Sequence, residues 1–352
     1  MLDSSITAKY SQMIYRSKAP LRIGLAGGGT DVSPYSDLYG GAILNATISL
    51  YANASIEPSE NNKIILEAND RGEMEQYELT NELPVNGRLD LLKGVYNCIV
   101  RDYGGIKNGF KLSTFVDAPA GSGLGTSSTL VVAIIGVFAE MCRLPLGEYD
   151  IAHYAYEIER KYLKLAGGRQ DQYAATFGGV NFMEFYADDK VIVNPLRIKQ
   201  QYLFELENNL VLYYTSTSRE SARIIEQQSK NVVANKEQSI EAMHHLKQQS
   251  QMLKEALLKG RLNEFGEILD YGYKQKKKMA EGISNPLIEE IYETAKDAGA
   301  TGGKISAADG GGFMTFYCPG TTKYKVIKSL EKFGGHHRNY QFVEHGLETW
   351  TI

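Results

Sequence analysis

The 352-residue sequence predicts an α+β fold built from two closely packed lobes. Two observations favour this class. Segments with the period-two pattern of strands run straight into glycine-rich loops, and helical periodicity follows those loops. Toward the end of the chain, helix and strand patterns alternate in the manner of an α+β sandwich. We expect an N-terminal lobe at residues 1–196 and a C-terminal lobe at residues 197–352.

The first lobe is predicted to begin with a strand in which Leu21, Ile23 and Leu25 alternate with smaller or polar residues. Arg22 lies on the opposite face of that strand, which ends at Gly27. Further strands are expected at 42–56, 63–68, 74–79, 110–116, 180–185 and 190–193. Helices are expected at 89–99, 130–141 and 149–165.

The second lobe is predicted to begin with a strand at 210–214, a helix at 218–230 and a long helical region at 237–279. Asn285-Pro286 then starts a helix that reaches residue 298, because proline is favoured in the first helical turn. A glycine loop with a strand at 302–317, a helix at 324–333 and a strand at 341–351 complete the lobe.

The composition argues against several classes of protein. The net charge of −4 gives no electrostatic reason to expect nucleic acid or an anionic membrane as a partner. Three scattered cysteines argue against a disulfide framework or a structural zinc site and favour the cytoplasm. We find no pattern of a signal peptide, and the apolar run Leu130–Ala139 is too short to span a bilayer.

The most informative segment is the glycine-rich loop Pro119–Ser128, which leads into an apolar helix. Glycines let a backbone approach an anion closely, and the following helix directs its free N–H groups toward it. The loop lacks the lysine of a P-loop, and Thr126 replaces the third glycine of a dinucleotide fingerprint. A turn with a helix cap remains an alternative. However, three glycine-rich segments, near residues 27, 121 and 310, adjoin predicted strands, and a phosphorylated ligand would explain all three.

These segments resemble the three motifs of the GHMP kinases, the family of galactokinase, homoserine kinase, mevalonate kinase and phosphomevalonate kinase. The motifs match Pro20–Asp31, Pro119–Ser128 and Lys304–Phe313, in that order. The resemblance implies an N-terminal ATP-binding lobe and a C-terminal ferredoxin-like α/β sandwich. Arg16–Arg22, Gly27–Tyr35 and Tyr214–Arg219 are most similar to the sugar-1-kinases that act on D-glycero-D-manno-heptose 7-phosphate. Such kinases make heptose 1,7-bisphosphate for nucleotide-heptose, capsule or lipopolysaccharide synthesis.

The resemblance also implies roles for individual residues. Asp171 matches the aspartate that faces the acceptor hydroxyl, and Arg22 matches the cation near the transferred phosphoryl group. Ser127 and Glu159 match the ligands of Mg²⁺. The ATP-binding residues would be Pro119, Gly121, Ser122, Gly123, Leu124, Gly125, Thr126, Ser127 and Ser128. The residues expected at the sugar phosphate are Lys18, Gly28, Gly29, Thr30, Asp31, Arg169, Gln172, Arg219, Gly311 and Gly312.

Several of these residues also have a purely structural explanation. Asp171 and Asp31 are typical of turns that follow glycines, and Glu159 could pair with a neighbouring cation on the surface of a helix. Ser127 also fits a helix cap. An ion pair between Arg22 and Asp171 is compatible with a role in catalysis.

The pocket for the sugar's phosphate is the least specific part of the prediction. Lys18, Arg169 and Arg219 are the candidates, although an arginine that starts a helix is often solvated. The C-terminal loop also departs from the family, because Ala307 and Asp309 stand where glycine is usual.

Two other functions remain open: a fucose-type kinase of the same family, and a catalytically silent ligand sensor with the same fold. A homo-oligomer is also possible. We interpret the basic residues Lys274, Lys276, Lys277 and Lys278 as a solvated helix face. His336, His337 and His345 lack a convincing metal-ligand pattern.

Overall fold

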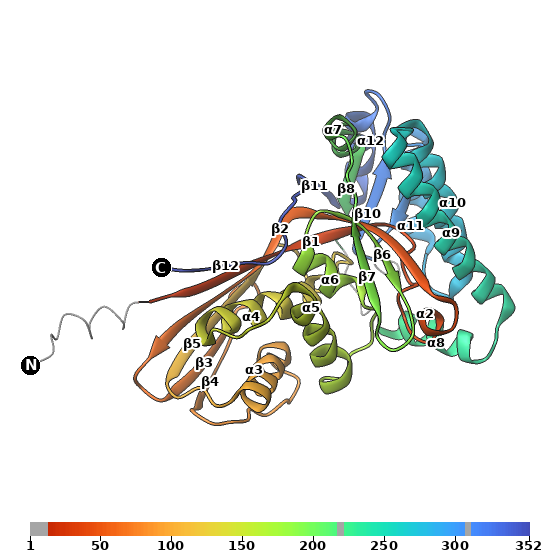
Figure 1. Ribbon diagram of the computed structural model, residues 1–352. Helices are drawn as coiled ribbons and strands as arrows, with labels where there is room; N and C mark the ends of the chain where they lie inside the picture. Colours follow the sequence, from red (N-terminus) through yellow and green to blue (C-terminus); the bar gives the residue numbers. More distant parts are fainter. Residues whose placement is uncertain (1–12, 217–221, 307–310) are drawn as a thin grey trace, which may run out of the picture.

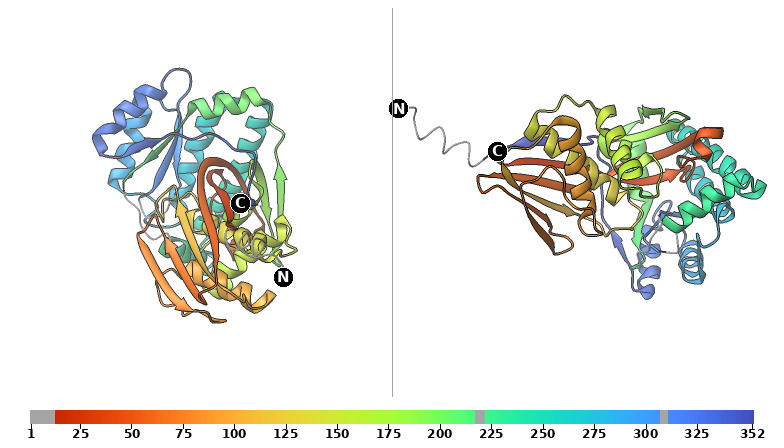
Figure 2. Two further views of the ribbon diagram at one scale, coloured as in Figure 1. Left: turned by 90° about the vertical axis from the view of Figure 1, so that its left-hand side faces the viewer. Right: turned by 90° about the horizontal axis from the view of Figure 1, so that it is seen from below.

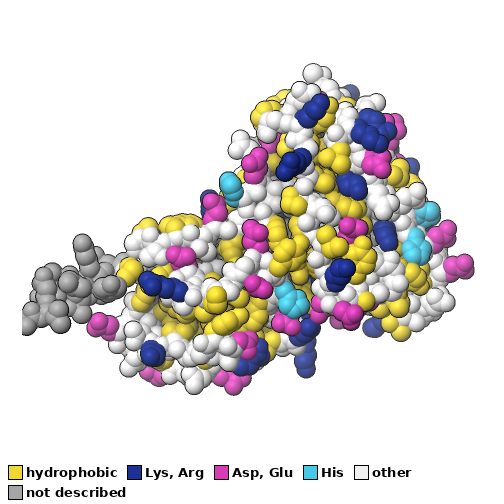
Figure 3. All heavy atoms as spheres, viewed as in Figure 1, with side chains coloured by type: hydrophobic (Ala, Val, Ile, Leu, Met, Phe, Trp, Pro, Cys, Tyr) yellow, Lys and Arg dark blue, Asp and Glu magenta, His cyan; other side chains and the backbone are white. Residues whose placement is uncertain are grey.

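The structure is a computed structural model that describes residues 13–216, 222–306 and 311–352. Two β-sheets and the helices packed on them form the molecule (Figure 1). The predicted α+β class with two lobes is confirmed. Arg219, Ala307 and Asp309 lie outside the described residues. On the face shown in Figure 3, side chains of both charges are interspersed.

The first sheet contains eight strands, with β12-β1-β2-β5-β3-β4 along its main path. The long strands β1 (Tyr15–Ala26) and β2 (Gly41–Ser59) pair antiparallel, and β6 and β7 extend the sheet beyond β2. The remaining strands are β3 (Lys63–Ala68), β4 (Glu73–Glu78), β5 (Gly109–Val116), β6 (Val180–Phe185), β7 (Val191–Pro195) and β12 (Glu348–Thr351).

Helix α4 (Thr126–Cys142) packs against β1 and β2 and is buried over most of its length. This burial explains its nearly continuous apolar sequence, since no face of its middle turns meets water. The helices beside it are α3 (Asp90–Tyr103), α5 (Glu148–Tyr156) and α6 (Gln170–Phe177). The predicted helix at 149–165 is shorter, because α5 passes into a π-helical turn, Glu157–Tyr162. The sequence did not predict the five-residue α2 (Tyr35–Tyr39).

The second sheet has the strand order β11-β8-β10-β9, and all its pairs are antiparallel. Helices connect β8 to β9 and β10 to β11, so the unit has the βαββαβ topology of a ferredoxin-like sandwich, as predicted. Its strands are β8 (Leu210–Tyr214), β9 (Gly302–Ile305), β10 (Phe313–Tyr317) and β11 (His336–Arg338).

The helices of the second unit bring the two sheets together. α9 (Glu237–Lys259) contacts β1 and β2, whereas α10 (Phe265–Met279) contacts β9 and β10, and the two helices lie side by side (Figure 1). The predicted helix at 237–279 is divided because Gly260, at φ +68°, ends α9 before a 3₁₀ turn, Leu262–Glu264. The other helices are α7 (Gln200–Asn209), α8 (Ala222–Val233), α11 (Pro286–Asp297) and α12 (Lys323–Leu330), followed by a 3₁₀ turn at Glu331–Phe333.

The last strand differs from the prediction in its place. Residues 341–351 were expected in the second lobe, but β12 pairs with β1 of the first sheet, from Thr351 opposite Tyr15 to Glu348 opposite Lys18. The chain therefore returns to its starting sheet, and its C-terminus lies beside the start of β1 (Figure 2). The boundary at residue 196 stays a prediction. Among the described residues, no helix is long and apolar enough to cross a membrane.

Candidate active site

A cavity of about 580 Å³ lies where the end of β1, the loop before α4, the start of α6 and the helices α8 and α10 meet. Most of the predicted catalytic, metal and ATP-binding residues line this cavity. The predicted residues in its wall are Arg22, Gly28, Gly29, Asp31, Gly121, Gly123, Gly125, Thr126, Ser127, Ser128, Glu159 and Asp171. The structure thus brings together residues that lie up to 149 positions apart along the chain.

Arg22 and Asp171 form the polar centre of the cavity. Nε and Nη2 of Arg22 lie 2.7 and 2.6 Å from Oδ1 of Asp171, and Nη1 donates to the carbonyl of Gly123 at 2.5 Å. Arg22 is buried, whereas the Asp171 side chain keeps about a quarter of its surface (23%) exposed. The carboxylate is therefore fixed by a neighbouring cation and still open to a ligand.

The glycine loop packs closely against Arg22 and Asp171. Gly125, the residue before α4, has φ +79°, and a Cβ built on it would lie 3.1 Å from Cγ of Asp171. Both the positive φ and the close approach favour glycine. The loop is anchored from behind, because the carbonyl of Leu124 accepts from Arg22 N and the carbonyl of Ser122 accepts from Phe313 N. Ser122, Leu124 and Pro119 accordingly support the loop without lining the cavity.

Glu159 and Ser127 place two oxygen atoms beside the loop. Oγ of Ser127 lies 3.4 Å from Oε1 of Glu159, which is fully buried. Gln172 was predicted to bind the sugar phosphate, but its buried side chain donates to Oε2 of Glu159 at 2.5 Å and to Oγ of Ser128 at 3.1 Å. Gln172 therefore orients Glu159 from behind the cavity wall.

Asp31 lies at the other end of the cavity and is almost fully buried. Its Oδ2 accepts hydrogen bonds from the backbone N–H groups of Arg169 and Gln170, at 2.9 and 3.0 Å. Burial raises the pKa of the Asp31 carboxyl, although these two N–H groups oppose the shift. Thr30 was predicted, like Asp31, to bind the sugar phosphate, but its hydroxyl instead hydrogen-bonds the backbone of Gly27 and Ala42.

Two lysines that the sequence did not point to complete the site. Lys276 of α10 and Lys304 of β9 both line the cavity. Nζ of Lys304 donates to the carbonyl of Gly24, and burial together with Lys276 and Arg22 holds the Lys304 pKa well below its usual value. Burial, together with the charge of Arg22, lowers the pKa of Lys276 to about 8.

Lys276 was wrongly interpreted as part of a solvated face. Its neighbours behave differently, since Lys274 pairs with Asp270 and Lys277 pairs with Glu289 at the surface. Gly272 and Met279 lie four residues before and three after Lys276 and are buried, so helical spacing places all three on one face. That spacing is the signal that would have found Lys276.

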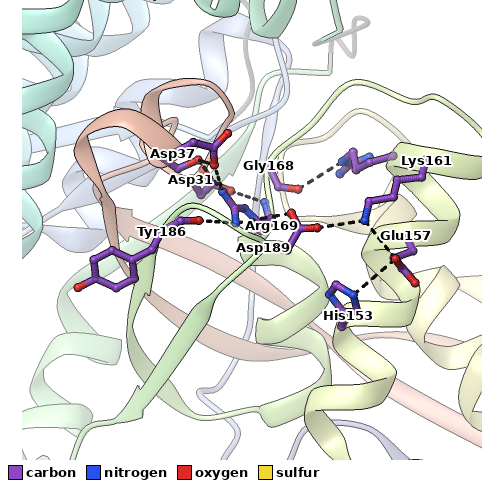
Figure 4. Close-up of polar contacts among 11 residues, drawn as sticks. Asp31, Asp37, His153, Glu157, Lys161, Gly168, Arg169, Tyr186 and Asp189 are labelled. Atoms are coloured by element: carbon purple, nitrogen blue, oxygen red, sulfur yellow. Dashed lines mark hydrogen bonds and ion pairs between the residues drawn. The ribbon is translucent and has the colours of Figure 1, made fainter.

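Several predicted sugar-phosphate residues lie away from this cavity. Lys18 is in the part of β1 beside β12, where Nζ lies 2.8 Å from Oε2 of Glu348. Gly312 accepts from Thr215 with its carbonyl and, like Gly311, does not line the cavity. Arg169 is buried, and its guanidinium binds Asp37, Ser36 and the carbonyl of Tyr186 (Figure 4).

Comparison with known proteins matches the chain to a family. Residues 90–179 match the GHMP kinases N terminal domain, and residues 253–336 match the GHMP kinases C terminal domain. The chain is 48% identical over 337 residues to the D-glycero-alpha-D-manno-heptose 7-phosphate kinase of Campylobacter jejuni subsp. jejuni serotype O:2, covering 96% of this chain and 99% of the relative. The chain belongs to the GHMP kinases. It is therefore an enzyme of the phosphotransferase class, and its relatives support a role as a heptose kinase.

Solved structures agree with this membership. A D-glycero-D-manno-heptose 1-phosphate kinase from Bacteroides thetaiotaomicron superimposes with a TM-score of 0.82 at 46% identity, covering 96% of this chain and 99% of that one. The galactokinase of Lactococcus lactis in complex with galactose superimposes with a TM-score of 0.77 at 19% identity, covering 98% and 99%, and shows the shared fold. The L-fucokinase/L-fucose-1-P guanylyltransferase of Bacteroides fragilis is 28% identical, over 87% of this chain and 34% of its own length.

Proposed function

We propose that this GHMP kinase transfers the γ-phosphoryl group of ATP to the anomeric hydroxyl of D-glycero-D-manno-heptose 7-phosphate. The product would be heptose 1,7-bisphosphate, made in the cytoplasm for nucleotide-heptose, capsule or lipopolysaccharide synthesis. The observation that carries the proposal is the Arg22–Asp171 pair facing the glycine loop within one cavity. The 48% identity to a heptose 7-phosphate kinase supports the choice of acceptor.

The loop and α4 supply the phosphate-binding part of the site. Gly121, Gly123 and Gly125 all have positive φ values and line the cavity, so the backbone lies open to a ligand. The free N–H groups at the start of α4 add the positive end of a helix dipole. These features suit the charged phosphates of ATP.

Ser127 and Glu159 are suited to Mg²⁺. Two hard oxygen ligands next to a phosphate loop match the way magnesium binds, since it keeps waters and phosphate oxygens as its other ligands. The hydrogen bond from Gln172 to Oε2 leaves Oε1 of Glu159 directed toward Ser127. Bound there, the ion would neutralise phosphate charge during transfer.

Asp171 acts on the acceptor hydroxyl. Its partly exposed carboxylate orients the hydroxyl and accepts its proton as the oxygen attacks the phosphorus. Arg22 holds the carboxylate in place and, with Lys276, provides positive charge where the transferring group carries negative charge. The sugar hydroxyls would bind at the opposite end of the cavity, near Gly28, Gly29 and Asp31.

The test is release of ADP with Mg-ATP and a panel of acceptors: heptose 7-phosphate, mannose 6-phosphate, free heptose, fucose, galactose and mevalonate. We expect a strong preference for heptose 7-phosphate. Preference for fucose would overturn the assigned acceptor and favour the fucose-type kinase. Binding of ATP and sugar without any ADP release would overturn the proposed transfer and favour a ligand sensor.

A further inference from the structure

A second cavity, of about 420 Å³, adjoins the active-site cavity. Asp31, Arg160 and Gly167 are among the residues that line both cavities, and they mark where the two adjoin. The second cavity extends away from the glycine loop, toward α5 and α8. A molecule bound at Asp171 can thus extend past Asp31 into this space.

Three cationic side chains line the second cavity: Arg160, Arg169 and Lys230. Arg160 is largely buried, with 12% of its side chain exposed, and its contacts are long. Its guanidinium lies 3.3 and 3.5 Å from the carbonyls of Gly168 and Leu165, and 3.7 Å from the carboxylate of Glu159. No closer carboxylate pairs with it among the described residues, so its charge is only partly compensated.

Gly167 allows this position of Arg160. A Cβ built on Gly167 would lie 2.2 Å from Nη2 of Arg160, so the guanidinium rests directly on the backbone. Because Gly167 has no side chain, the guanidinium of Arg160 can lie where the two cavities adjoin.

Arg169 contributes a buried donor. Asp37, Ser36 and the Tyr186 carbonyl bind its two terminal nitrogens, and Asp189 lies 3.9 Å from Nη1 (Figure 4). Its Nε is buried and has no hydrogen-bond partner among the described residues. Because leaving a charged group's N–H without an acceptor is costly, this atom favours an anionic ligand in the cavity that Arg169 lines.

Lys230 lies on α8 at the mouth of the cavity. Its side chain is exposed and forms no ion pair or hydrogen bond within the described part of the chain. Two acidic residues also line the space. Burial raises the pKa of the Asp31 carboxyl and so favours its neutral form, and Glu226 is exposed at the rim.

We propose that the second cavity binds the phosphate group that the sugar acceptor already carries, with Arg160, Lys230 and Nε of Arg169 as its donors. This inference rests on the proposed function, because it assumes that a hydroxyl of the same sugar binds at Asp171. It makes Arg160 and Lys230 the residues that select phosphorylated over unphosphorylated sugars. Lys18, which pairs with Glu348 elsewhere, has no part in it.

The experiment compares Lys230→Gln and Arg160→Gln with the wild type, using heptose 7-phosphate and unphosphorylated heptose as acceptors. Arg223→Gln is the matched control, because Arg223 is an exposed cation on the same helix that lines neither cavity. We expect the KM for heptose 7-phosphate to rise about tenfold or more in each of the two variants, since each loses a charge-assisted hydrogen bond. The KM for unphosphorylated heptose and the KM for ATP should change little in Lys230→Gln.

Equal changes for the phosphorylated and unphosphorylated sugars in both variants would overturn the inference. A second measurement is independent of turnover: binding of inorganic phosphate in the presence of saturating ADP, which occupies the glycine loop. Phosphate binding that weakens in Lys230→Gln but not in Arg223→Gln supports the cavity even if the wild type phosphorylates none of the heptoses, which would refute the proposed function alone. Phosphate binding that is absent, or equal in all variants, would overturn the subsite.

Discussion

The partly buried positive charge of Lys276 destabilises the folded, ligand-free protein. Its pKa of about 8 lies below the ordinary 10.5, mainly because burial disfavours the charged form. At 1.36 kcal/mol per pKa unit this difference corresponds to about 3 kcal/mol. Lys276 is only half-buried, so contact with water reduces the effect to about 1–2 kcal/mol. Lys276→Met, which removes the charge and is one atom shorter, should therefore stabilise the ligand-free protein by about 1–2 kcal/mol at pH 7.

The pH dependence identifies the cause. Below about pH 8, Lys276 is charged in both the folded and the unfolded protein, so the whole penalty is present. Between about pH 8 and 10.5, the folded protein loses this proton before the unfolded chain does, and the penalty disappears. The advantage of Lys276→Met should thus be constant below pH 8 and shrink toward zero as the pH approaches 10.5.

The assay is urea unfolding of wild type and Lys276→Met at pH 7, 8, 9 and 10, with Lys278→Met as the control on an exposed position of α10. The same variant should lose about tenfold or more in kcat/KM, because the cavity loses a fixed positive charge. A gain in stability that does not vary with pH, or no gain at all, would refute the argument that a buried charge destabilises the ligand-free site. Unchanged kcat/KM would refute its role in transfer.

Three further substitutions test other parts of the site. Asp171→Asn should lower kcat by about 10²- to 10⁴-fold through loss of the proton acceptor, while nucleotide binding measured by calorimetry persists; turnover near that of the wild type would contradict the assignment. Gln172→Leu should raise the Mg²⁺ concentration for half-maximal activity by about 10- to 100-fold, because Glu159 loses the donor that orients it, and a magnesium titration with an unchanged midpoint would exclude this role. Gly125→Ala should raise the KM for ATP and cost about 1 kcal/mol of stability, because alanine disfavours φ +79° and its Cβ meets Asp171. The matched change Gly72→Ala, at φ +62° but with open space around its Cβ, should cost stability without affecting ATP.

The sequence predicted the features that depend on local patterns. Alternation in β1 and the apolar run of α4 identified those elements, because each one's burial repeats along the segment itself. The Arg22–Asp171 contact joins residues 149 positions apart, and only the family motifs suggested it. The ferredoxin-like order of the second sheet was likewise implied by the resemblance rather than by periodicity.

The failures come from packing that local patterns do not encode. β12 looks like any other edge strand in sequence, and its pairing with β1 depends on where the chain returns in space. Gln172 and Thr30 were both predicted to bind the sugar phosphate, but neither lines the cavity. Gln172 donates to Glu159, and the hydroxyl of Thr30 donates within a turn. Lys276 was missed because it stands among surface lysines, and the whole run was interpreted as a solvated face. The buried Gly272 and Met279 lie on the same helix face as Lys276 and indicate otherwise.

The central claim is that Asp171 and Arg22 direct phosphoryl transfer to the anomeric hydroxyl of a heptose phosphate. Phosphorus NMR of a reaction containing heptose 7-phosphate and Mg-ATP tests it most directly. Besides the signals of ADP, we predict one new sugar-phosphate signal, coupled to the anomeric proton. It should be formed by the wild type and strongly reduced with Asp171→Asn. A new phosphate on any other sugar oxygen, or the same signal formed at an equal rate by both proteins, would contradict the account.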